Sequence, residues 1–148
     1  LRIGRNRSQT FPLLQRDTLQ PLLNRTINGK YAPGSPFKTL VALIGLQTGT
    51  LHKERGMVCK GGFYSGGKML LGCHGHPYVN NVQQAIAQSC NNYFVTSWLE
   101  NVNRFGGLSP KEGFDKFNDY LYQFGLGRKL GIDFRGEIDG FIPTSEFF

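Results

Sequence analysis

Acidic residues are scarce over the first two thirds of the chain. Residues 1–99 contain eleven Lys and Arg but only two acids, Asp17 and Glu54, which gives a net charge of +9. Residues 100–148 contain six basic and eight acidic residues, a net charge of −2. A basic stretch can bind nucleic acid or an anionic surface. Here the basic residues are scattered and no nucleic-acid-binding motif accompanies them, so we expect no nucleic-acid partner.

Long apolar runs and an even set of cysteines are also missing. The longest apolar run is far shorter than a membrane span, and no signal peptide opens the chain. Three cysteines do not suggest a disulfide framework. The 148 residues, 39% of them hydrophobic and 18% charged, suit a soluble folded chain that is one domain or part of a larger one. Because Leu1 is not a methionine, we expect the natural chain to begin elsewhere.

The sequence predicts a helix over about residues 36–47. Ser35 is a good N-cap, Pro36 suits the first helical position, and Gly49 is a C-cap candidate. The body of this helix is apolar on every side, with Lys38 as its only charge. A helix that is hydrophobic all round is a buried one, so we expect this helix at the centre of the core.

Ser35 and Lys38 are three residues apart, so their side chains share one face of the first turn. Burial pushes a lysine towards its neutral form, and a neutral amine beside a serine hydroxyl is a nucleophile with its base. The helix N-terminus adds backbone N–H groups suited to a developing oxyanion. The pattern therefore indicates acyl-transfer chemistry. The alternative is an ordinary N-capped core helix whose Lys38 extends to solvent.

A second S-x-x-K copy lies at Ser65-Gly66-Gly67-Lys68. Two glycines between the pair make a poor helix start, and no apolar run follows, so this copy predicts a loop. The surrounding residues 50–78 are rich in glycine and contain short β-type pieces at residues 62–66 and 68–71. These pieces predict hairpins.

Helical periodicity returns after Asn80. Two helical segments are predicted on either side of an interruption at residues 89–92, and Gly106-Gly107 ends the second. A further helix is predicted from Ser109-Pro110 to Gly125, because a cap and a proline mark its start. We expect residues 1–30 to form a loop or short helix, and residues 131–148 to be extended and rich in turns.

The interruption contains Ser89-Cys90-Asn91. Ser and Asn compete with the backbone for hydrogen bonds, so one interpretation is a plain polar turn. The other is that the junction presents a second hydroxyl and an amide towards the first helix. S-x-x-K and S-x-N are two of the three motifs that identify penicillin-interacting serine enzymes. The third motif is K-T-G or a close variant.

Three ordered blocks of the chain resemble class B penicillin-binding proteins. Residues 24–38 match the family's N-R-x-x-x-G-x-Y-x-P-G-S-x-F-K block, and residues 88–94 match Q-S-C-N-x-Y-F. Residues 131–144 are similar to the G-I-D…G-E…G…P-T segment. The resemblance covers about residues 20–148 and is closest to the members that serve cell elongation. Pro36 stands where the family usually has Thr or Ser, and the chain contains no K-T-G.

The resemblance implies the mostly helical part of the α/β penicillin-binding/β-lactamase-like serine transpeptidase fold, with a buried central helix and small β-hairpins. Residues 1–148 would be a partial transpeptidase domain, without the N-terminal pedestal, the membrane anchor and the C-terminal sheet portion that carries K-T-G. We expect such a fragment to be inactive on its own. Its parent would lie on the outer, periplasmic face of the bacterial cytoplasmic membrane, in a cell-elongation complex.

The resemblance also implies a peptidoglycan D,D-transpeptidase that works through an acyl-serine intermediate and needs no cofactor. Ser35 would attack the penultimate D-Ala carbonyl of a stem peptide, with Lys38 as general base. Ser89 would relay a proton to the leaving D-Ala, and Asn91 would bond the acyl-chain amide and Lys38. β-Lactams would acylate Ser35. A penicillin-recognising sensor or a β-lactamase-like domain is the alternative, and a basic nucleic-acid module is a third.

Cysteines and histidines gather in the glycine-rich region. Cys59, Cys73, His74 and His76 form a C-x13-C-H-x-H pattern, and thiolate with imidazole suits tetrahedral zinc. The resemblance supports a metal here, because some relatives carry one, and its role would be structural. A Cys59–Cys73 disulfide or uncoordinated thiols are the alternatives. Cys90 is predicted to be a packing residue, although its position also makes it a candidate fourth ligand.

Overall fold

The computed structural model describes residues 6–107 and 109–147. Its helices are α1 (Arg7–Arg16), α2 (Arg25–Asn28), α3 (Phe37–Thr48), α4 (Val82–Ala87), α5 (Asn91–Gly106) and α6 (Pro110–Gln123), and a 3-10 turn, η1, spans Ser145–Phe147. The strands are β1 (Met57–Val58), β2 (Gly62–Ser65), β3 (Lys68–Gly72) and β4 (Tyr78–Val79). The mostly helical architecture with small hairpins is therefore confirmed.

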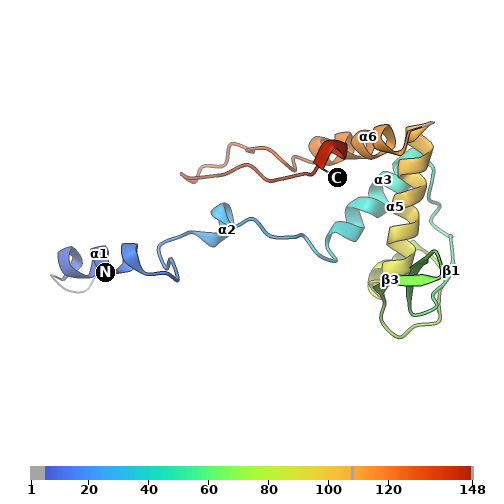
Figure 1. Ribbon diagram of the computed structural model, residues 1–148, viewed down its shortest axis with the longest axis horizontal. Coiled ribbons are helices and arrows are strands. Elements are labelled where there is room, and N and C mark those ends of the chain that lie inside the picture. The colour runs from blue at the N-terminus through green and yellow to red at the C-terminus, as the bar shows by residue number, and fades with distance from the viewer. Residues whose placement is uncertain (1–5, 108, 148) are drawn as a thin grey trace.

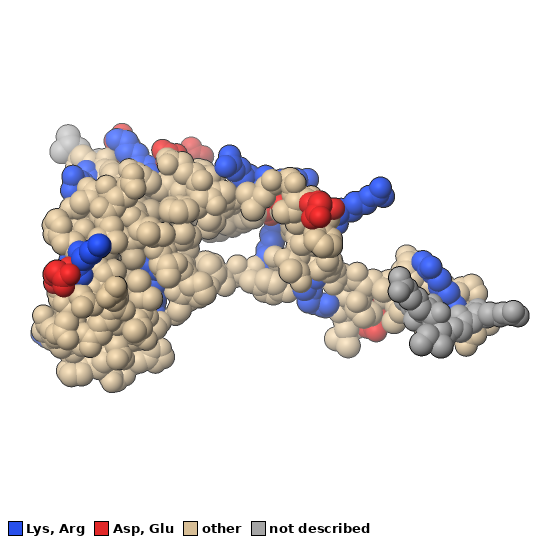
Figure 2. Space-filling view, turned by 180° about the vertical axis from the view of Figure 1, so that it is seen from behind, with Lys and Arg blue, Asp and Glu red and all other residues tan. Residues whose placement is uncertain are grey.

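Figure 1 shows α3, α5 and α6 packed into one body, with the hairpins beside the N-terminal end of α5. The segment with α1 and α2 extends away from this body, and the tail after α6 doubles back beside it. Lys and Arg side chains are dispersed over the face in Figure 2 rather than gathered into one patch. Among the described helices, none is both long enough and apolar enough to cross a membrane.

Helix α5 is the centre of the body, since it packs against α3, α6 and the β2–β3 hairpin. Tyr93, Ser97 and Asn101 recur every fourth residue on one face and are buried. The polar groups on this face are paired, since the Ser97 hydroxyl donates to the Tyr93 carbonyl and the Asn101 amide donates to the Ser97 carbonyl. Thr48 of α3 donates its hydroxyl to Asn101 Oδ1 at 2.8 Å. This buried bond joins the end of α3 to α5.

Helix α3 has the predicted extent, and Gly49 caps it with a left-handed φ of 71°. Two details differ from the sequence prediction. The Ser35 hydroxyl does not cap the helix; it bonds another side chain, described below. The helix is also not buried all round, since Leu43 is 50% exposed. The reason is that α4 and α5 pack against one side of α3, which carries the buried residues Val41, Ala42, Ile44 and Gly45.

Strands β2 and β3 form an antiparallel hairpin in which Ser65 pairs with Lys68. Gly66 and Gly67 have φ values of 57° and 78°, the left-handed pair that a tight two-residue hairpin turn needs. The second S-x-x-K copy is therefore a hairpin turn, as its glycines predicted, and not a helix start. Strands β1 and β4 form a second antiparallel pair.

The tail after α6 is extended as predicted and is held by side chains. The Asp115 carboxylate accepts the Ser145 backbone N–H at 2.9 Å and its hydroxyl at 2.6 Å. The Asn118 amide donates to the Pro143 carbonyl at 2.8 Å. Asn28, the last residue of α2, donates its side-chain amide to the Gly136 carbonyl. The tail is thus bonded to both α6 and the N-terminal segment.

Gly45 of α3 lies in close contact with Leu51 and with Asn101 of α5, and this contact generates a stability prediction. A Cβ at this position would lie 2.9 Å from Leu51 Cβ and 3.4 Å from Asn101 Nδ2. Gly45→Ala should gain helix propensity yet lose more through overpacking, a net destabilisation of about 1–2 kcal/mol in the free energy of unfolding. Denaturant unfolding measures it. The exposed Gln47→Ala is the control, and a stabilised Gly45→Ala chain would contradict the close contact.

Candidate acyl-transfer site

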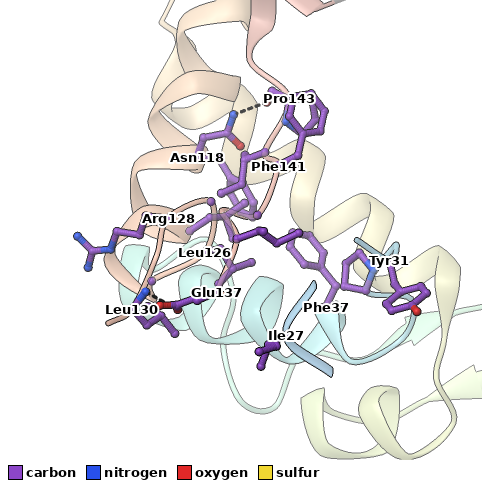
Figure 3. Close-up of a pocket in the computed structure, with 18 of the residues that line it drawn as sticks. Ile27, Tyr31, Phe37, Asn118, Leu126, Arg128, Leu130, Glu137, Phe141 and Pro143 are labelled. Carbon is purple, nitrogen blue, oxygen red and sulfur yellow. Dashed lines mark hydrogen bonds between the residues drawn. The ribbon is translucent and has the colours of Figure 1, made fainter. Parts of the chain in front are cut away.

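Two cavities lie side by side and share Phe37 and Trp98 as walls. The smaller, of about 410 Å³, is lined by Ser35, Lys38 and Asn91 as well as apolar side chains. The larger, of about 750 Å³, is lined mainly by apolar side chains, with Asn118, Arg128 and Glu137 among its polar ones. Figure 3 shows the larger one, with side chains of the N-terminal segment on one side and of the tail on the other. Ser35, Lys38 and Asn91 line the smaller cavity, so the candidate catalytic site is in the smaller of these two cavities.

Ser35, Lys38 and Ser89 are joined by short hydrogen bonds. The hydroxyl oxygens of Ser35 and Ser89 are 2.9 Å apart. Lys38 Nζ donates to Ser89 Oγ at 2.8 Å and to the Ser89 carbonyl at 2.6 Å. The fold therefore brings together two motifs more than 50 residues apart in sequence, with Ser89 between the other two side chains.

The Lys38 amine has an unusual environment for a lysine. It lies in the first turn of α3 and is partly buried. Burial lowers its pKa from the ordinary value, while the nearby Cys73 and Cys90 thiols act in the opposite direction. A lowered pKa makes the neutral, proton-accepting form of the amine more available. The sequence-based expectation about burial of this amine therefore agrees with the structure.

Ser89 occupies the turn between α4 and α5 with a φ of 50°. The Ser89 N–H donates to the Ile86 carbonyl, and the Cys90 N–H donates to the Ala85 carbonyl. These two bonds form a Schellman motif, in which the left-handed position is usually glycine. A serine here is strained, because its Cβ crowds the backbone. The two Schellman bonds hold Ser89 in this conformation, with its hydroxyl beside Ser35 and Lys38.

Asn91 begins α5 and lines the same cavity as Ser35. Its side-chain amide donates to the Gly72 carbonyl at 2.7 Å, and its backbone N–H donates to Cys73 Sγ at 3.2 Å. The resemblance implies that Asn91 bonds the acyl-chain amide and Lys38, and the Lys38 bond is not among the bonds of the described residues. Instead, the hydrogen bonds of Asn91 join the start of α5 to the end of β3.

Four ligating side chains converge directly beside this turn. The ligand atoms of Cys59, Cys73, His76 and Cys90 all lie within 4.8 Å of one another. His74, predicted as a ligand, is exposed and lies outside the group, because the turn from His74 to His76 brings only His76 inward. Cys90 packs in the core, as predicted, and its sulfur also lies among the candidate ligand atoms. Cys90 is fully buried at the N-cap of α5 and faces the hairpin cysteines.

The thiols of the cluster are all free, so the alternative of a Cys59–Cys73 disulfide is not what the structure contains. Burial raises the pKa of Cys73, but the Asn91 and Asn92 backbone N–H groups and the neighbouring thiols outweigh it, and the net pKa is lowered. Burial raises the pKa of Cys90 to about 12. In the sequence, only the position of Cys90 next to Ser89 indicated that its sulfur could join those of Cys59 and Cys73.

The penicillin-binding protein transpeptidase domain matches residues 4–148, almost the whole chain. The chain belongs to this family. Figure 1 therefore shows the helical part of a penicillin-binding transpeptidase domain, as the ordered motif blocks predicted.

The relatives are peptidoglycan D,D-transpeptidases named MrdA. The protein from Acinetobacter baumannii is 33% identical over 136 residues, and the one from Escherichia coli K12 is 26% identical over 149 residues. These matches cover 86% and 95% of this chain but only 18% and 21% of the relatives. The transpeptidase-family chain thus spans about a fifth of the length of the curated relatives it matches.

A solved structure has the same fold. The crystal structure of Pseudomonas aeruginosa PBP2 in complex with WCK 5153 superposes with a TM-score of 0.74 at 26% sequence identity. The match covers 93% of this chain and 30% of that one. The resemblance to the penicillin-binding protein 2 group is confirmed by sequence and by structure.

The strained turn of this penicillin-binding domain gives a prediction that separates strain from hydrogen bonding. Ser89→Ala and Ser89→Gly both remove the hydroxyl, but only glycine adopts a φ of 50° without steric cost. The Gly variant should therefore be the more stable by about 1 kcal/mol in the free energy of unfolding. Equal stability of the two variants in denaturant unfolding would show that the turn is unstrained.

Proposed function

We propose that this chain carries the acylation site of a peptidoglycan D,D-transpeptidase, which cross-links D-Ala-D-Ala stem peptides and is acylated by β-lactams. The observation that carries the proposal is the hydrogen-bonded series Ser35–Ser89–Lys38 in a member of the transpeptidase family. The relatives named as peptidoglycan D,D-transpeptidases support the substrate class. We also propose that the protein acts at the outer face of the cytoplasmic membrane, within a cell-elongation complex.

Each side chain has a role in the proposed reaction. Ser35 Oγ attacks the penultimate D-Ala carbonyl, and its proton passes through the Ser89 hydroxyl to Lys38 Nζ, along contacts of 2.9 and 2.8 Å. The carbon–nitrogen bond to the terminal D-Ala then breaks, and Ser89 relays the proton from Lys38 to the leaving amine. An amine of a second stem peptide then attacks the acyl-serine carbonyl and loses a proton to Lys38. That proton passes through Ser89 to the departing Ser35 oxygen, which restores the free serine. Asn91, on the wall of the cavity, binds the acyl-chain amide.

We further propose that Cys59, Cys73, His76 and Cys90 hold a structural zinc ion. The donor set of three sulfurs and one imidazole is typical of such sites. Tetrahedral zinc with Zn–S bonds of about 2.3 Å separates its sulfurs by about 3.8 Å, which fits ligand atoms within 4.8 Å of one another. His76 Nε2 lies 3.8 Å from Cys73 Sγ, close to the separation of two ligand atoms on one tetrahedral ion. The ion would supply no chemistry beyond fastening the hairpin to α5.

The chemistry is tested by covalent labelling with a fluorescent penicillin. A chimera in which this chain replaces the matched stretch of the Acinetobacter baumannii transpeptidase should be labelled. Ser35→Ala and Lys38→Ala should reduce the labelling rate at least about a hundredfold, since one removes the nucleophile and the other its base. Because burial lowers the Lys38 pKa, the rate should rise with pH through an apparent pKa below 10.5.

The chain contains its own matched control for this experiment. Ser65→Ala and Lys68→Ala alter the S-x-x-K copy in the hairpin turn and should leave labelling unchanged. Labelling that survives Ser35→Ala in a folded chimera would refute the assignment of the nucleophile. Labelling without cross-linking of stem peptides would favour the penicillin-recognising sensor or β-lactamase-like alternative.

The metal proposal is tested by elemental analysis of the chain purified without chelator. We expect about one zinc per chain, released on acidification because only thiolates and neutral imidazole bind it. Cys90→Ser and His76→Ala should abolish binding, whereas His74→Ala should not, since His74 lies outside the cluster. A zinc content well below one, or equal loss with His74→Ala, would contradict the ligand set.

A further inference from the structure

The three cysteines beside Ser89 differ sharply in their access to solvent. Cys59 is 5% exposed and Cys90 is fully buried, whereas Cys73 is only partly buried. All three are free thiols, and their sulfurs lie within 4.8 Å of one another. A reagent from solvent therefore meets Cys73 first, with two buried thiols directly behind it.

We propose that this cluster is a thiol–disulfide exchange site for low-molecular-weight disulfides, with Cys73 as the entry thiol and Cys59 or Cys90 as the resolving thiol. In the first step the Cys73 sulfur attacks the small disulfide, forms a mixed disulfide and releases one small thiol. In the second step the buried thiol attacks Cys73 Sγ, forms a protein disulfide and releases the other small thiol. Two protein thiols are oxidised as one small disulfide is reduced.

The exchange acts on the turn that holds Ser89. A disulfide brings two sulfurs to about 2.05 Å, which requires movement from the separations in the cluster. Cys90 lies between Ser89 and Asn91, and Cys73 Sγ accepts the Asn91 backbone N–H. A change at either sulfur therefore displaces the start of α5. Metal binding and oxidation use the same sulfurs, so each excludes the other.

The test incubates the chelator-treated chain with glutathione disulfide, traps remaining thiols with an alkylating reagent, and maps the products by peptide mass spectrometry. We expect a glutathione adduct on Cys73 first, followed by a disulfide that joins Cys73 to Cys59 or Cys90. Cys73→Ser should slow the loss of thiols at least about tenfold, because the other two cysteines are buried. Zinc added beforehand should slow the reaction of the unaltered chain.

A double variant isolates the second step. In the chain with Cys59→Ser and Cys90→Ser the reaction should stop at the Cys73 adduct, which retains the glutathione mass. If a variant fails to fold, the unaltered chain is sufficient for the test, because the Cys73 adduct must form before the protein disulfide. A first adduct on a buried cysteine, or a Cys73 adduct that never resolves, would overturn the proposal. The readout is mass alone, so it is independent of whether Ser35 is acylated.

Discussion

The fixed register between α3 and α5 is the constraint on which the rest of this domain depends. Ser35 and Lys38 belong to the start of α3, whereas Ser89 and Asn91 flank the start of α5. At one end, Lys38 donates to the Ser89 carbonyl and hydroxyl. At the other, Thr48 donates to the buried Asn101, and Gly45 allows the close approach. The contacts at both ends of α3 are needed to keep the Ser35 and Ser89 hydroxyl oxygens 2.9 Å apart.

The turn before α5 is a second junction, where the site meets the hairpins. The Asn91 side chain donates to the Gly72 carbonyl, and Asn92 donates to the Val58 carbonyl. Cys90 adds a buried sulfur beside those of Cys59 and Cys73. The glycine-rich hairpins have few buried apolar side chains, so these polar and sulfur contacts substitute for a core of their own.

Much of the local structure could be predicted from the sequence, because its causes are local. Gly66 and Gly67 determine a tight hairpin turn, and Gly49 determines where α3 ends, since both need a left-handed backbone. The Ser35–Lys38 pairing follows from helical spacing. The motif blocks also predicted the family, because their order and separation are specific to it.

Tertiary packing determined which side chains become partners and which are buried, and the spacing of residues in the sequence did not predict this. The sulfur of Cys90 lies among the candidate ligand atoms and His74 does not, because a turn at the end of β3 and the cap of α5 determine which side chains face inward. Asn91 bonds the hairpin because β3 ends beside it. Leu43 is exposed although its helix is apolar all round, because burial depends on which elements cover each face. Residue types and their spacing are properties of the sequence, whereas side-chain partners depend on segments distant in the chain, and these meet only in the folded structure.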